Sequence, residues 1–195
     1  MHFLPLVTGS IFYDLLKHGR EIESAIARHD ASLLNHSTPE LERYFSRPPS
    51  EIPQQNAFPV ATLFPLFLVA FVFNLLPFLH ALPGLSPPLY ALSFFAPSLV
   101  MIAALIATSV LLARGFTAGL AGFLALFLIM LLLTVLQGFH QLLAKGGGGW
   151  TMTVAIIALL GCRMVLNSRR VVLFAIYCRT QRLAILAGKM RLKCR

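Results

Sequence analysis

Carboxylates are the side chains in this sequence best suited to general acid, general base or metal chemistry. All seven Asp and Glu residues lie before Pro53, so the rest of the chain has none. Proton-coupled transport, aspartyl proteolysis within the membrane and metal-dependent transfer of lipid headgroups generally need a carboxylate at or near the bilayer. The sequence also lacks the usual motifs of serine hydrolases, zinc proteases and P-loop nucleotide-binding proteins. We therefore expect no enzymatic activity.

Three residues near the N-terminus could in principle hold a metal ion. Asp14, His18 and His29 fall near one face of a predicted helix. Two histidines so far apart are a poor match to the ligand spacing of zinc sites, and solvated side chains are the simpler interpretation. We expect neither a bound metal nor a cofactor.

A second set of polar side chains lies within the most apolar part of the sequence and comprises Asn74, Thr134, Gln137 and His140. Residues three apart share a helix face, so Thr134 and Gln137 form a stripe. Asn74, on another helix, is expected at a similar depth and within reach of Gln137. The structural interpretation is hydrogen bonding between helices, worth roughly 0.6 to 2 kcal/mol for each bond. The functional alternative is a polar patch or the mouth of a conduit.

The composition shows what must position these residues. Hydrophobic residues make up 57% of the chain, charged residues make up 12%, and the mean hydropathy is +0.78. Soluble domains carry roughly 25% charged residues, enough to cover their surface. The sequence therefore predicts an all-α membrane protein.

Long uncharged stretches divide the membrane region into four predicted transmembrane helices with short connections. Each is close to the roughly 20 residues that cross a hydrocarbon layer about 30 Å thick. Prolines and glycines at 83–88, Arg114 and the glycine run 146–149 separate them. The predicted spans are 57–79, 89–113, 116–139 and 150–166.

The positive charges predict the orientation. With four spans, every lysine and arginine except Lys145 falls on one side of the membrane. Cytoplasmic flanks keep an excess of these residues. We therefore expect both termini in the cytoplasm and a location in a bacterial inner membrane.

Residues 1–56 are predicted to form a small cytoplasmic helical segment. Apolar residues recur at helical spacing from Ile11 to Ile26, which predicts an amphipathic helix over about 10–29. Ser37 or Thr38 as the cap, with Pro39 at the first position, predicts a second, short helix. The apolar face of the first helix could rest on the membrane surface, which we favour, or dock a partner.

The tail, residues 167–195, is predicted to be a basic amphipathic helix beside the membrane. Its arginines directly follow apolar spans, so attraction to anionic lipid headgroups explains the sequence pI of about 10.2 better than nucleic-acid binding does. We expect membrane lipids as partners and no nucleic acid. The predicted headgroup contacts are Arg163, Arg169, Arg170, Arg179 and Arg182.

Small residues gather at the start of the third span. Gly115 and Gly119 are four apart, as are Ala118 and Gly122. Such pairs allow helix backbones to approach closely. The spacing does not decide between contacts within one chain and contacts in a homo-oligomer.

These observations favour a non-enzymatic protein that binds or shields another membrane component, with a membrane protein as its partner. In size and number of spans the chain resembles bacterial immunity and exclusion proteins, which implies an immunity, exclusion or assembly role. One alternative is an oligomeric channel or membrane-permeabilising subunit lined by Asn74, Thr134 and Gln137. Another is a membrane-shaping protein whose terminal amphipathic helices wedge into one leaflet.

Overall fold

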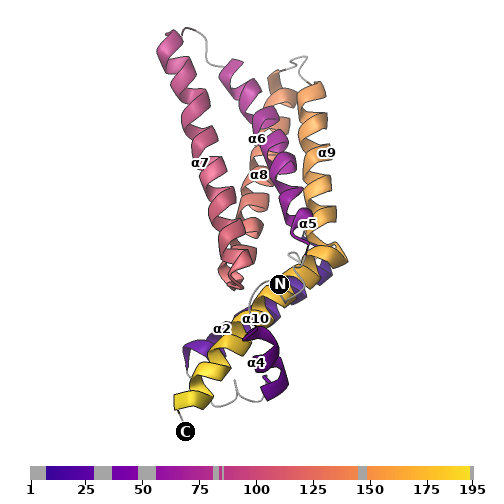
Figure 1. Ribbon diagram of the computed structural model, residues 1–195. Helices are drawn as coiled ribbons and strands as arrows, with labels where there is room; N and C mark the ends of the chain where they lie inside the picture. Colours follow the sequence, from indigo (N-terminus) through magenta and orange to yellow (C-terminus); the bar gives the residue numbers. More distant parts are fainter. Residues whose placement is uncertain are drawn as a thin grey trace.

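A computed structural model shows an all-α membrane protein (Figure 1). The structure describes residues 8–28, 37–47, 56–80, 84, 86–144 and 149–193. Within them, five helices are long and apolar enough to cross a membrane. Four of the five stand side by side as a bundle, and the fifth runs obliquely across one end of it. We call that end the basal end and the opposite end, where α6 finishes at His80, the distal end.

The four helices of the bundle match the predicted spans closely. Two connections join the spans at the distal end. Of residues 81–85 only Gly84 is among the described residues, and residues 145–148 lie outside them. The first span begins with the short helix α5, and Thr62 separates it from α6 with its hydroxyl donating to the Pro59 carbonyl at 2.7 Å. The elements are α5 (Phe58–Ala61), α6 (Leu63–His80), α7 (Pro87–Ala113), α8 (Thr117–Ala144) and α9 (Gly149–Leu166).

The bundle is held together by an apolar core between its helices. Helix α6 packs along α9, α7 packs along α8, and α8 also contacts α6 and α9. Phe67 and Phe123 are fully buried and stack with their ring centroids 6.2 Å apart. Leu63, Leu105 and Leu120 are almost completely buried with them. Toward the distal end α7 diverges from α8, so the contact between these two helices is tightest in the basal half (Figure 1).

The predicted small-residue contact lies within one chain, between α7 and α8. A Cβ atom on Gly119 would meet the Leu112 nitrogen at 2.4 Å, and one on Gly122 would meet Thr108 Cγ2 at 2.2 Å. Two of the four predicted residues differ from expectation. Ala118 is exposed, and Gly115 precedes α8.

Gly115 ends α7 instead of packing along α8. Its φ is +74°, a left-handed conformation that glycine adopts without steric cost. The Phe116 nitrogen donates to the Leu111 carbonyl at 3.0 Å, and the Gly115 nitrogen donates to the Leu112 carbonyl at 2.9 Å. These are the two bonds of the Schellman motif that closes many helices. A Cβ on Gly115 would lie 2.4 Å from the Cys178 carbonyl, so the turn also sits directly on the tail helix.

The basal end is covered by three helices, namely α2 (Ser10–Ala27), α4 (Pro39–Phe45) and α10 (Arg169–Lys193) (Figure 1). The two N-terminal helices were predicted closely. Thr38 caps α4, with its hydroxyl accepting from the Leu41 nitrogen at 3.3 Å. On α2 the buried side is centred on Phe12, Leu15 and Leu16, whereas Ile11 is about half exposed. The apolar face of α2 is therefore covered by the chain itself, mainly by α8 and α10.

The tail is helical as predicted, but its apolar residues are not confined to a lipid-facing side. Val171, Ala175 and Cys178 form a buried stripe on α10, which packs against α2, α4, α5 and α7. Leu173 and Ile176 on the same helix are exposed. Helical periodicity showed that α10 has a face to bury, but it could not show whether lipid or protein buries it.

Candidate binding pocket between the spans

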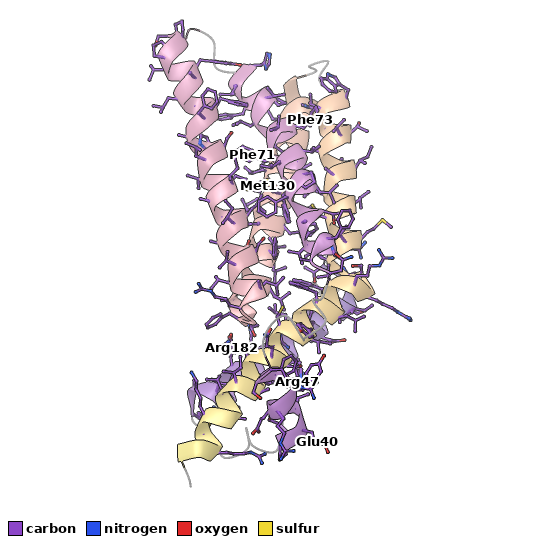
Figure 2. All side chains as sticks on the ribbon, in the orientation of Figure 1. Glu40, Arg47, Phe71, Phe73, Met130 and Arg182 are labelled. Carbon is purple, nitrogen blue, oxygen red and sulfur yellow. The ribbon has the colours of Figure 1, made fainter. Side chains whose placement is uncertain are left out.

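Three of the four polar residues predicted within the membrane, Asn74, Gln137 and His140, line a cavity of about 530 Å³ between α6, α7 and α8. Most of its walls are apolar, among them Phe71, which lies between α6 and α7 in Figure 2. Pro77 of α6 and Pro97 of α7 also line it. A proline inside a helix removes one backbone hydrogen bond and disfavours straight packing. Two of the three helices around the cavity, α6 and α7, therefore each lack one backbone hydrogen bond beside it.

Asn74 is bound to α8 through Thr134, not through Gln137 as the sequence suggested. Its Nδ2 group donates to Thr134 Oγ1 at 2.9 Å and to the carbonyl of Ala70 at 2.7 Å. Thr134 in turn donates its hydroxyl hydrogen to the Met130 carbonyl at 2.8 Å. Both N–H groups of Asn74 are thus used. This arrangement confirms that Asn74 and the α8 stripe lie at the same depth.

Two amide groups in the pocket keep unused hydrogen-bonding capacity. Asn74 is 8% exposed, and its Oδ1 has no hydrogen-bond partner among the described residues. The Oε1 and Nε2 atoms of Gln137 are also buried and make no hydrogen bond within that part of the chain. Both residues line the cavity, and so does His140, whose side chain is exposed at the distal rim. The unused groups are one amide oxygen and one complete amide.

We predict that Thr134→Val lowers the free energy of unfolding by about 1 kcal/mol, because it removes one bond between helices in an apolar surrounding. The change would be measured by reversible denaturation of the purified protein in mixed micelles. Thr153→Val is the matched control, because Thr153 Oγ1 donates only to the carbonyl of Gly149 on its own helix, and it is exposed. Equal losses in the two variants would contradict a bond that stabilises the bundle.

A second, smaller cavity of about 350 Å³ lies between α8 and α9 and includes Arg163 in its lining. Arg163, Arg169 and Arg170 are exposed around the turn that joins α9 to α10. Their exposed side chains lie where contacts with lipid headgroups would require them.

Arg179 differs from the predicted headgroup contact. Its side chain is 6% exposed, and its NH1 and NH2 groups donate to the Leu15 carbonyl at 3.5 and 3.4 Å. A Cβ on Gly19 would lie 2.4 Å from Arg179 NH2, so glycine makes room for the guanidinium on α2. The face of α10 that carries Arg179 is turned toward α2, and this burial removes the arginine from the lipid surface.

Arg182 also faces protein. It lies where α7 ends above α10 (Figure 2), with its guanidinium carbon 3.7 Å from the ring centre of Phe116. Its NH1 group donates to Glu23 Oε1 at 3.3 Å, and the same carboxylate oxygen accepts from the Thr117 nitrogen at 2.8 Å. Glu23 therefore pairs with an arginine of α10 and caps the first turn of α8.

Sequence reasoning missed the roles of Gly19 and Glu23 and most of the pocket walls. Glu23 reads as one of several charges on the polar side of α2, and no local signal separates it from Glu21. The pocket walls come from three helices, so their meeting depends on how the helices pack. Of the three residues considered for a metal and set aside, Asp14 and His18 are exposed and His29 lies outside the described residues. Among the described residues no cluster of three metal-binding side chains is found.

We found no match to this chain among protein-family models, curated proteins or solved structures.

Proposed function

We propose that this protein acts without enzymatic chemistry by binding another membrane component through the pocket between α6, α7 and α8, in a shielding, immunity or assembly role. The observation that carries the proposal is the pair of amide side chains, Asn74 and Gln137, that line an apolar cavity and keep buried hydrogen-bonding groups without a partner among the described residues. In a hydrocarbon layer such groups cost several kcal/mol when they stay unsatisfied. A bound component with matching groups would recover that free energy.

A conduit through a single chain has less support. Basal to the Asn74–Thr134 bond, the centre of the bundle is filled by Phe67, Phe123 and Leu105, each fully buried. A polar path along the bundle axis would have to displace them. The geometry therefore favours a site that is reached from the side.

We also propose a bacterial inner-membrane location with four crossings and both termini in the cytoplasm. The basal helices carry most of the basic residues, which supports a cytoplasmic basal end. Trp150 is exposed at the distal end, packed edge-on against Phe73 at 5.4 Å, where an indole suits the outer interface. Although α10 is long enough to cross, its oblique path and buried Arg179 favour a position at the basal surface.

A photo-crosslinking amino acid at position 136 tests the binding proposal. Leu136 lines the pocket and is 55% exposed, so it would contact a bound component directly. Ile157 on α9 is 62% exposed and lines neither cavity, which makes it the matched control. After irradiation of native membranes, we expect one defined adduct at position 136, identified by mass spectrometry, and only bulk lipid at position 157. The same adducts at both positions would rule out a selective site.

A further inference from the structure

The pocket between α6, α7 and α8 has the size and chemistry of a small-molecule site. We infer, resting on the proposed function, that it binds a neutral lipid-class molecule with one apolar chain and a hydroxyl or amide head. Its volume of about 530 Å³ falls within the range of roughly 300 to 1,000 Å³ typical of sites for single small molecules. A transmembrane helix, about 10 Å across and about 30 Å long, occupies a much larger volume than this. The volume therefore favours a lipid-class occupant over a partner helix.

The unused polar atoms specify the head group. Asn74 offers only its Oδ1 acceptor, because both of its N–H groups are already bonded to Ala70 and Thr134. Gln137 has an unused acceptor and an unused donor, and because both amide atoms are covered by protein, its side chain must turn into the cavity to meet a head group. A hydroxyl or an amide can donate to one of these side chains and accept from Gln137. A ketone or an ester has no hydrogen to give, so it leaves the buried Asn74 oxygen unsatisfied.

The charge of the lining favours a neutral ligand. No lysine, arginine or carboxylate lines this pocket, and His140 at its rim is the one titratable side chain among the described lining residues. A charged head would be buried beside amides without a counter-ion, at a high cost in free energy.

The pocket also has an apolar entrance on its lipid-facing side. Leu133, Leu136 and Phe78 line it and are 41%, 55% and 61% exposed. In a bundle surrounded by lipid, exposed apolar side chains on a wall place that wall in contact with the hydrocarbon. The ligand therefore reaches the amides from the bilayer, with its chain toward the lipid and its head toward Asn74 and Gln137.

Two photoreactive probes of equal length test this inference on the full-length protein in nanodiscs. One is hexadecan-1-ol with a diazirine in its chain, and the other is the corresponding diazirine hexadecane. We expect the alcohol to label α7 and α8 peptides around Pro97 and Leu136 saturably, and about tenfold more strongly than the hydrocarbon, as one or two hydrogen bonds would produce. Excess hexadecanol should compete, and excess hexadecane should not.

Gln137→Leu is the decisive variant, because it removes a complete amide that has no bond within the described chain, so the fold should not depend on it. Its labelling by the alcohol should fall about tenfold while its labelling by the hydrocarbon is retained, which shows that the pocket persists. Gln181→Leu on α10, outside the pocket, should behave as the original protein. Equal labelling of the original protein by the two probes, or an unchanged Gln137→Leu, would overturn the inference.

The two proposals fail in different ways. A protein adduct at position 136 in native membranes, unaffected by hexadecanol, would leave the binding function standing and overturn the lipid-class ligand. Absence of any selective adduct at position 136 would overturn the binding function, and a lipid-class ligand in the membrane with it.

Discussion

Gly119→Val is expected to lower the free energy of unfolding by about 3 kcal/mol, the upper end of the usual range for overpacking. The reason is that a Cβ at this position would lie 2.4 Å from the Leu112 nitrogen, 2.7 Å from its Cα and 2.8 Å from the Thr108 carbonyl oxygen. All three are backbone atoms, so no side-chain rotation can relieve the overlap and α7 must move away from α8. Reversible denaturation in mixed micelles would measure the loss.

Ala118→Val provides the control at the neighbouring position. Ala118 is exposed on the same helix, so a valine there introduces the same β-branched side chain without meeting α7. Its effect should stay within about 0.5 kcal/mol, as for most surface substitutions. If the two variants lost the same stability, the effect would belong to the valine and not to the α7–α8 contact.

The glycines at the start of the third span show what sequence spacing can predict and what it cannot. The spacing correctly identified Gly119 and Gly122 as close-packing residues, because helix approach requires small side chains at such intervals. It placed Gly115 in the same set, although that residue closes α7 at a positive φ. Glycine serves helix contacts and helix ends for different reasons, and only the location of the turn separates them.

The spans themselves were predictable, because lipid requires backbone hydrogen bonds to be made within each segment and apolar length reports this directly. The candidate site was predictable only in part. Asn74, Thr134 and Gln137 were identified as polar groups within apolar helices, but the bond formed is Asn74 to Thr134. The cavity beside them depends on the divergence of α7, which no single helix encodes.

The basal layer, formed by α2, α4 and α10, was the least predictable region, because its contacts join residues far apart in the chain. An exposed carboxylate and a capping carboxylate look the same in a helical repeat. In the structure, Glu23 is 32% exposed at its side chain and accepts from both Thr117 and Arg182, whereas Glu21 is 63% exposed and lies 3.8 Å from His18. The difference arises from the position of α8 and α10 above α2.

Glu23→Ala is therefore expected to weaken the docking of α2 under the bundle by about 2 kcal/mol. Loss of the acceptor for the Thr117 nitrogen contributes about 1 kcal/mol, as for a lost helix cap. Loss of the partly exposed ion pair with Arg182 contributes up to about 1 kcal/mol after allowance for solvent screening. Hydrogen exchange of the purified protein should show faster exchange across α2 (Ser10–Ala27) and at the start of α8, with the middle of the spans unchanged.

Glu21→Ala separates this role from a general effect of charge. It removes the same carboxylate from the same helix, but its one described ion-pair contact is the exposed His18, so α2 should keep its exchange rates. Accelerated exchange in both variants would show that net charge holds α2 in place, and acceleration in neither would show that Phe12, Leu15 and Leu16 suffice. Acceleration in Glu23→Ala alone would establish that one carboxylate holds α2 against α8 and α10. That carboxylate would then connect the basal layer to the bundle.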